Sequence, residues 1–309
     1  MKNLNSIYEE INLRQAVLLG KDISNVNLCN ADLQCTNLTD YDFTNKDLTS
    51  INLRESNITG SNFTGASLRN ANLSGIKTGK GQGSQDKKSV VVMIGTDLEQ
   101  ANLSGADLRK ADFTDSNLKN ANLKGAILDN ACFRNSILTG ANLEGANLSK
   151  AFFAGSDLKE ANLNGTDCRG VKFHDAKISG CSFQKANLKK VDLSNLDLQK
   201  IDLSEADLRL TDLRHSNLYA ARLFKTDLRN SLLLNANLTG AYLSSALMQG
   251  ADLQWAILKQ ATLRYATNLT PQQIQSAKID RQTKIPRYLE VHWISNEEFY
   301  CKVKETFKS

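Results

Sequence analysis

The chain has 309 residues, of which 41% are hydrophobic, 23% charged and 6% aromatic, so it is long enough to bury a sizeable core. Its 18 glycines and 2 prolines exclude collagen-like and Gly/Pro-rich chains, and no apolar run approaches the ~20 residues of a transmembrane helix. The formal net charge of +5 is spread along the chain, without a polyanionic or polycationic tail.

The N-terminal segment, residues 1–10, reads MKNLNSIYEE and lacks the hydrophobic stretch of a secretory signal. We expect it to cover the first edge of the fold as an N-terminal cap. The six cysteines, at positions 29, 35, 132, 168, 181 and 301, form no CxxC pair, which argues against a disulfide scaffold or a zinc site. Reduced thiols in a cytoplasmic protein are therefore expected.

A repeat of five residues dominates residues 11–75 and 96–266. A small residue, then Asp or Asn, then Leu or Phe, then two variable polar residues recur, as in ANLSG ADLRK ADFTD SNLKN ANLKG. The large apolar centre occurs 13 times from Leu13 to Leu73 and 34 times from Leu98 to Leu263, without a shift of register. Of these 47 centres, 46 are Leu, Phe, Ile or Met, and the exception is Cys168.

A period of five fits neither an α-helix, nor a flat strand, nor a coiled-coil heptad. The position two before each centre is usually Ala, Ser, Thr or Val, so each unit has two apolar residues separated by one outward residue. Asp or Asn precedes 32 of the 47 centres, which suits side chains that accept hydrogen bonds from nearby backbone at turns. Five residues cannot bury a core alone, so the units must wind into coils that stack on one another.

The tandem A(D/N)LXX pattern resembles that of the pentapeptide-repeat proteins over most of the chain. The resemblance implies an all-β fold, a right-handed quadrilateral parallel β-helix with four pentapeptides per turn, closed by a short helical C-terminal cap. Nearly twelve such coils would form a solenoid rod roughly 55 Å long. The ending LTPQQIQSAKIDRQTKIPRYL is similar to that of cyanobacterial members.

Centres that lie twenty residues apart would then stack into continuous apolar columns inside the rod. Burial of each large side chain contributes roughly 1.5–3 kcal/mol, so these columns are the expected structural core. Representative core residues are Leu103, Leu123, Leu143, Leu163, Phe153 and Phe173.

The repeat is interrupted by residues 76–95, IKTGKGQGSQDKKSVVVMIG. The Gly/Lys/Gln/Ser-rich middle favours a loop insertion, whereas Val91 and Met93 fall in the two inward positions and favour one degenerate repeat. The loop is either a flexible surface segment without a role or a projecting element that binds a partner, as loops do in family members that protect DNA gyrase. Its candidate partner-binding residues are Lys77, Lys80, Lys87 and Lys88. The glycines precede the strand instead of following it, so a nucleotide-binding P-loop is not expected.

Residues 267–309 depart from the repeat and are predicted to cap the last coil with one or two helices. The first helix should begin after Thr270, with Pro271 at its first position, and end near Ala277.

A second helix is predicted further on, because Ser295 and Glu298 have the spacing of a capping box. An apolar stripe at i, i+4 and i+8 follows it: Phe299, Val303 and Phe307. The tail either plugs the last coil or exposes Trp293, Tyr300 or Phe307 to form a homodimer or to dock a partner.

No residues with the pattern of a catalytic or metal site are found. His174 and His215 fall at outward positions about two coils apart, roughly 10 Å, which is too far to share a metal ion. Cys168 and Cys181 fall at inward positions and are interpreted as small core residues. We therefore expect no enzyme activity, no cofactor and no metal.

One outer face carries a basic strip, which we define as Arg109, Lys110, Lys150, Arg169, Lys189, Lys190, Arg209 and Arg229. Asp129 interrupts it, and the turn residues Asp107, Asp167, Asp207 and Asp227 lie alongside. The strip is either a solvated ladder that compensates its own charge or a docking surface for an acidic partner. The adjacent face has outward apolar side chains at Phe152, Leu232, Leu234 and Trp255, with Phe224 and Tyr219 on other faces.

These features favour a non-enzymatic protein–protein interaction scaffold or regulator with an unidentified protein partner. The alternative, drawn from the resemblance, is a DNA mimic that binds the topoisomerase DNA gyrase, which would need a strongly negative face. The repeats contain 26 basic and 25 acidic residues, so this alternative is disfavoured. The same balance argues against direct binding of nucleic acid through the basic strip.

Overall fold

The computed structural model describes residues 25–78 and 90–307. The predicted N-terminal cap lies outside the described residues. So does most of the predicted loop, including Lys80, Lys87 and Lys88.

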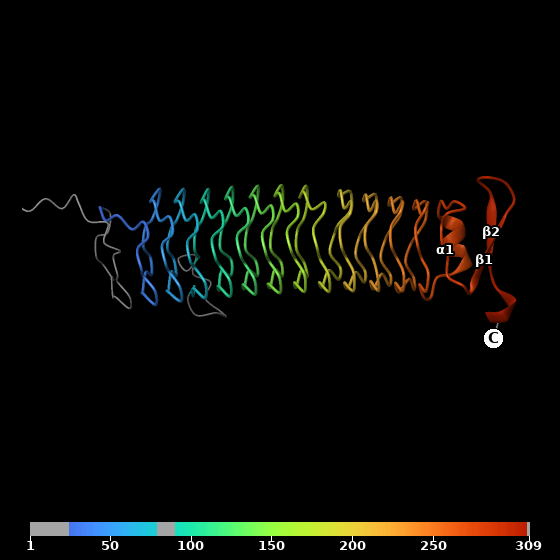
Figure 1. Cartoon of the computed structure of the whole chain (residues 1–309), viewed down its shortest axis with the longest axis horizontal. Helices are drawn as coiled ribbons and strands as arrows, with labels where there is room; N and C mark the ends of the chain where they lie inside the picture. Colours follow the sequence, from blue (N-terminus) through green and yellow to red (C-terminus); the bar gives the residue numbers. More distant parts are fainter. Residues whose placement is uncertain (1–24, 79–89, 308–309) are drawn as a thin grey trace, which may run out of the picture.

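The described repeats form coils that stack into a rod (Figure 1). Most repeats form a single isolated parallel bridge to the repeat twenty residues further on, as in the series Asn102, Asn122, Asn142 and Asn162. Twenty residues are four units of five, so each turn of the chain has four sides. Regular secondary structure is therefore sparse along the rod and is concentrated at its C-terminal end.

The corners of the coils explain why the unit has five residues. The residue two after each centre adopts a left-handed conformation, with φ of 60° at Lys110 and 66° at Gly125. The aspartate or asparagine before the centre closes the same corner. The Oδ1 atom of Asp112, for example, accepts the backbone N–H of Thr114 at 3.0 Å and its hydroxyl at 2.6 Å. These local hydrogen bonds turn the chain once in every repeat, after its two inward-facing residues.

The core consists of stacked columns of centres and the smaller inward residues that precede them. Leu103, Leu123, Leu143 and Leu163 are each fully buried. The rings of Phe113, Phe133 and Phe153 stack with centroids 4.8 Å apart, and Phe173 follows at 5.5 Å. The ring spacing equals the spacing of hydrogen-bonded strands, so each column follows the coils one for one.

The interruption of the repeat leaves the ladder in register. Asn57 is bridged to Lys77, 20 residues away, whereas Asn62 is bridged to Val92, 30 residues away. Ten residues are therefore added at one corner between two ordinary repeats. Ile76 and Met93, the inward residues on either side, are both buried.

The C-terminal cap begins with the helix α1, Pro271–Ser276. Thr270 is its N-cap and forms a reciprocal capping box with Gln273, while Ile274 is buried over the last coil. The chain then rejoins the ladder through bridges from Ile257 to Lys278 and from Thr262 to Lys284. Within the described ranges, no helix is long and apolar enough to span a membrane.

The predicted second helix is wrong, because the segment forms an antiparallel hairpin of β1, Leu289–Trp293, and β2, Phe299–Val303. The Oγ atom of Ser295 does accept the N–H of Glu298, at 3.1 Å, but this bond closes the hairpin turn. Phe307 lies in the following 3-10 helix, Glu305–Phe307.

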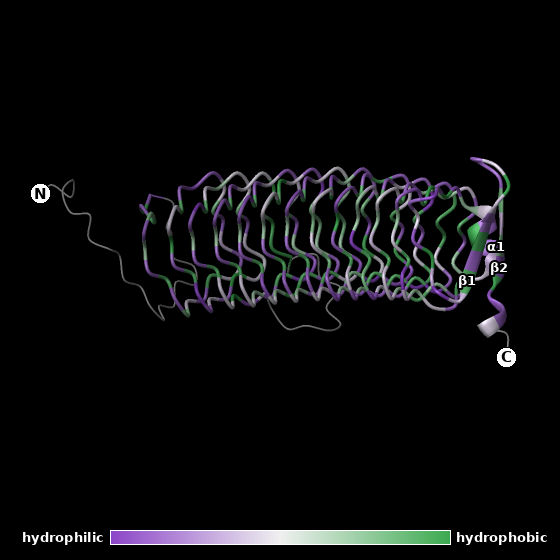
Figure 2. Ribbon diagram, turned by 45° about the vertical axis from the view of Figure 1, so that its right-hand side comes forward, coloured by the Kyte–Doolittle hydropathy of each residue, from purple (hydrophilic) through white to green (hydrophobic). Residues whose placement is uncertain are grey.

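The hairpin lies beside α1 at the end of the rod (Figures 1 and 2). Its inward side chains, including Trp293 and Phe299, pack against the core, and the Arg281 guanidinium lies 5.3 Å from the Trp293 ring centroid. Tyr300 and Phe307 remain exposed. The tail thus covers the last coil, and a homodimer through its exposed aromatic residues stays a prediction.

Candidate functional site

The arginines of the basic strip are paired with aspartates of their own repeat. Arg209 donates from Nε to Oδ1 of Asp207 at 2.8 Å and from Nη2 to Oδ2 at 2.6 Å. The same fork joins Arg109 to Asp107, Arg169 to Asp167 and Arg229 to Asp227. Hydrogen bonds from Arg209 hold the pKa of Asp207 below its usual range. The arginines therefore fit the interpretation of a ladder that compensates its own charge.

The lysines of the strip are different. Among the described residues, no ion pair is formed by Lys110, Lys150, Lys189 or Lys190. Lys77 is exposed. It lies one coil before the start of the basic strip, since the N–H of Asp107 donates to the carbonyl of the neighbouring Ile76 at 2.9 Å. The free charge of this face is thus carried by lysines at its corners.

The apolar residues predicted on the adjacent face are not brought together. Phe152 is 37% exposed and has the Arg134 guanidinium 6.0 Å from its ring centroid. Trp255 is 55% exposed but lies five coils further along, ~24 Å away. Leu232 is exposed between them, and Leu234 is half-buried. This face offers separate contact points without a continuous patch.

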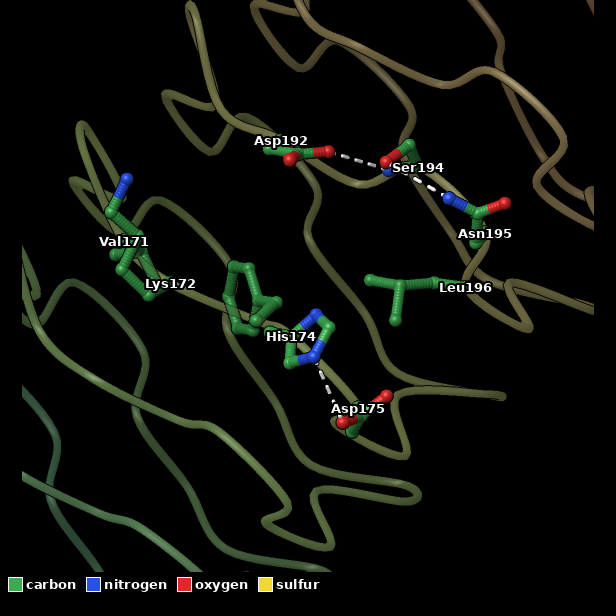
Figure 3. A pocket seen from close by; sticks show the side chains of 9 residues that line it. Val171, Lys172, His174, Asp175, Asp192, Ser194, Asn195 and Leu196 are labelled. Atoms are coloured by element: carbon green, nitrogen blue, oxygen red, sulfur yellow. Dashed lines mark hydrogen bonds and ion pairs between the residues drawn. The ribbon is translucent and has the colours of Figure 1, made fainter.

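A cavity of about 150 Å³ interrupts the wall of the rod (Figure 3). Val171, Phe173 and Leu196 form its apolar lining. Its polar rim includes the pair His174 and Asp175, whose Nε2 and Oδ2 atoms are 3.0 Å apart. On the opposing coil, Asp192 Oδ1 accepts the N–H of Ser194 at 2.9 Å. His174 was expected on the surface, where it lies, whereas the repeat pattern gave no signal of this cavity.

The cavity marks an opening in the hydrogen-bonded ladder. One coil earlier the ladder is regular, since the N–H of Phe153 donates to the Lys172 carbonyl at 2.8 Å. The corresponding bonds from Phe173 to Asp192 and from Ile178 to Asp197 are missing from the described structure. Lys172 and Asp192 still face one another as a bridge, but their coils are no longer closely paired.

Leu196 explains the opening. The same column holds smaller residues in the other coils, among them Ser136, Ser156, Ala176 and Ser216. Ser156 donates to the Phe153 carbonyl at 2.7 Å, and Ser216 donates to the Leu213 carbonyl at 2.7 Å. Leucine is larger than these serines and alanines, so it separates two coils that the smaller side chains would let pair closely.

The described residues contain no cluster of three or more potential metal ligands. Burial raises the pKa of the Cys168 thiol to about 12, and that of Cys181 also to about 12. Both thiols are therefore protonated core groups at neutral pH, not nucleophiles. His174 and Asp175 are largely exposed, so their contact is a solvated surface interaction.

The model of the family described as pentapeptide repeats matches the chain in eight copies. They cover residues 9–45, 42–75, 96–135, 126–165, 136–175, 166–204, 192–230 and 226–264. The chain belongs to the pentapeptide-repeat family. Its coils, corners and core columns are thus those of a pentapeptide-repeat fold, which the sequence pattern predicted.

Several solved pentapeptide-repeat structures are similar to this chain. HetL from the cyanobacterium Nostoc sp. strain PCC 7120, described as involved in heterocyst differentiation regulation, is 25% identical over 91% of this chain and 89% of its own, with a TM-score of 0.37. A structure of QnrB1, a plasmid-mediated fluoroquinolone resistance protein, is 16% identical over 71% of this chain and 84% of its own, with a TM-score of 0.35.

Rfr23 from the cyanobacterium Cyanothece 51142 is 19% identical over 55% of this chain and 79% of its own, with a TM-score of 0.15. No curated protein matched the sequence.

Proposed function

We propose that this pentapeptide-repeat protein is a non-enzymatic scaffold or regulator that binds a protein partner along the outside of its rod. We also infer that its coils form the right-handed four-sided β-helix of the family, which the twenty-residue bridge spacing supports. A cytoplasmic location is part of the proposal, because the described cysteines are free thiols, as in reducing compartments.

One observation supports the proposal most strongly. Large apolar side chains are exposed on the coils mainly in one stretch, between residues 210 and 265. They are Leu210, Tyr219, Phe224, Leu232, Tyr242, Trp255 and Tyr265. They lie on different sides of the coils, so they form no single patch, but exposed apolar groups commonly mark contact points, and a rigid solenoid presents them at fixed positions in this part of the rod.

The charge pattern does not favour the gyrase-binding alternative. A DNA mimic needs unpaired acidic residues at regular spacing. On the face of the basic strip, Asp167, Asp207 and Asp227 are instead neutralised by arginines of their own repeats.

The scaffold proposal is tested by affinity capture with the intact chain and a five-fold variant of the exposed region: Tyr219→Ser, Phe224→Ser, Leu232→Ser, Tyr242→Ser and Trp255→Ser. These positions point outward, so the variant should keep the wild-type melting temperature. We expect a partner that binds the purified wild-type protein in a fixed stoichiometry and is lost by the five-fold variant.

A matched control carries Ile137→Ser and Phe152→Ser, which remove exposed apolar groups from the other half of the rod. It should retain the partner. A partner held equally by all three proteins, or no partner with a fixed stoichiometry, would contradict the proposal.

A further inference from the structure

An open groove of about 680 Å³ lies on one face of the rod, within the stretch of exposed apolar residues. Arg222 and Tyr242 are bridged neighbours on adjacent coils and line its middle. Lys200 and Ala220 stand on one edge, and Phe224 and Ser244 on the other. Each edge of the groove has one small side chain, Ala220 or Ser244, next to a long or aromatic one, Lys200 or Phe224. The small side chains leave the space of the groove open.

The groove has aromatic walls that are available for contact. The side chain of Tyr242 is 57% exposed and that of Phe224 is 42% exposed. The Lys225 Nζ atom lies 5.2 Å from the centroid of the Phe224 ring, so a cation already covers part of this wall. A large apolar side chain of a partner could pack between the two rings, in the manner of an interface anchor.

The charge around the groove is positive and largely unpaired. Among the described residues, Lys200, Lys225 and Arg264 form no ion pair. Arg222 is 70% exposed, and its Nε atom is a distant 3.8 Å from Oδ2 of Asp202.

The two nearby acids already have partners. Asp202 accepts hydrogen bonds from Ser204 Oγ at 2.6 Å and Gln184 Nε2 at 2.8 Å, and Glu205 faces Lys185 at 3.9 Å. The four cations Lys200, Arg222, Lys225 and Arg264 outnumber these two acids, so the groove attracts negative charge.

We propose that this aromatic–cationic groove binds an acidic protein segment that carries at least one large apolar side chain. This inference rests on the scaffold function proposed above and specifies its site and the chemistry of its partner. The acidic groups pair with Lys200, Arg222 and Lys225, and the apolar side chain packs between Phe224 and Tyr242.

The same features disfavour a nucleic acid as the occupant. Asp202 and Glu205 lie on the same face one coil before Arg222 and Lys225, so the cations do not continue along the rod as a row that could follow a line of phosphates. The cations are few and irregularly spaced, whereas the aromatic pair lies within two adjacent coils. A short peptide segment with mixed acidic and apolar residues matches this arrangement better.

Fluorescence anisotropy with labelled twelve-residue peptides tests the inference on the full-length protein. The probe is Glu-Glu-Leu repeated four times. Three comparison ligands replace every Glu by Lys, replace every Leu by Ser, or consist of a twelve-nucleotide oligo-dT. We expect saturable binding of the Glu-Glu-Leu peptide that weakens as salt increases, and weaker binding of all three comparison ligands.

Two groove variants separate the contributions of the walls and the charges. Phe224→Ser with Tyr242→Ser removes the apolar walls, and Arg222→Gln with Lys225→Gln removes two cations. Each should weaken binding at least tenfold, and the second should also reduce the dependence on salt. If the first double variant is unstable, Tyr242→Ser alone serves, because this side chain is more than half exposed.

Matched controls change the same chemistry on other faces. Lys110→Gln with Lys150→Gln removes two free cations of the basic strip, and Phe152→Ser removes an exposed ring. Both should bind the peptide like the wild type. Equal loss in controls and groove variants, equal affinity for the Ser-containing peptide, tighter binding of oligo-dT, or no binding would each overturn the inference.

Failure of the groove as the binding site can be distinguished from failure of the scaffold function. A partner that is lost by the five-fold variant but retained by Phe224→Ser with Tyr242→Ser would remove the groove and leave the scaffold function intact. Loss of the partner in both variants, together with the peptide results above, supports the groove as its site.

Discussion

The residue that turns each corner adopts a left-handed conformation, whether or not it is glycine. Leu210 has φ of 60° and a side chain 45% exposed, so it gains little from packing. A left-handed conformation costs an L-residue roughly 1–2 kcal/mol, and glycine escapes this cost at the expense of chain entropy. The sequence pattern predicted the hydrogen-bonding Asp and Asn, but not the left-handed corners, because lysine, leucine and histidine occupy them as well.

Replacing Leu210 by glycine should therefore stabilise the rod. We expect Leu210→Gly to raise the free energy of unfolding by up to about 1 kcal/mol, measured by chemical denaturation. Leu210→Ala, which keeps the left-handed strain, should give no gain. The interpretation fails if the alanine variant is as stable as the glycine variant.

The aspartate–arginine forks predict a dependence of stability on pH. Hydrogen bonds from the adjacent arginine lower the pKa of Asp207 and of Asp167 in the folded state. A lowered folded-state pKa contributes stability above the unfolded value of about 3.9, and this contribution is lost as the pH falls below it. Asp207→Asn should thus destabilise the protein at pH 7 and lose most of this effect near pH 2.

Unfolding curves of wild type and variant at both pH values check this expectation. Asn187→Ala is the control, since Asn187 occupies the equivalent place one coil earlier and accepts the Lys189 N–H at 3.3 Å without carrying charge. Its effect on stability should be the same at both pH values. An equally constant effect for Asp207→Asn would show that the fork contributes no charge-dependent stability.

At the scale of the secondary-structure elements, a local sequence signal predicted the element correctly only where it is compatible with a single type of secondary structure. Thr270 as N-cap and the proline at position 271 specify α1 within a few residues. The hairpin was mistaken for a helix because a spacing of four fits both a helix face and a strand face. Cys301, which lies between Phe299 and Val303, is buried and completes the alternation of a strand. That alternation was the available signal.

The ladder opening at Leu196 was also visible in the sequence, but only when the chain is written in rows of twenty residues. Leucine then stands in a column of small residues, serines and alanines. The twenty-residue period came from the family resemblance, and the effect of one oversized residue on the backbone ladder depends on packing that no short motif encodes.

Hydrogen exchange tests the opening directly. The amides of Phe173 and Ile178 lack ladder partners and should exchange at least tenfold faster than those of Phe153 and Leu158, which donate at 2.8 and 2.9 Å one coil earlier. Leu196→Ser should restore the column and slow exchange at Phe173. Equal rates for the two coils in the wild-type protein would contradict the opening.

At the scale of the whole molecule, the twenty-residue turn determines the arrangement of the core, the corners and the surface. Residues twenty apart are neighbours, so the outside of the rod consists of ladders of side chains, and function depends on which ladders are left unpaired. The family resemblance implied this organisation, and self-compensation of the arginines was one of the two interpretations of the basic strip. The sequence did not predict the aromatic–cationic groove, because Lys200, Phe224 and Tyr242 come from three coils and meet only through the winding.

The twenty-residue period is tested most directly by engineered disulfides. Lys124 and Glu144 are neighbours on adjacent coils, with Nζ and Oε2 3.1 Å apart, whereas Lys119 is closer to Lys124 in sequence but lies at another corner. In a background with Cys29, Cys35 and Cys132 replaced by serine, oxidation should cross-link Lys124→Cys with Glu144→Cys, because adjacent strands bring Cα atoms within disulfide range. Mass spectrometry should find this cross-link and none between Lys119→Cys and Lys124→Cys. The reverse result would contradict the stacked coils on which the account depends.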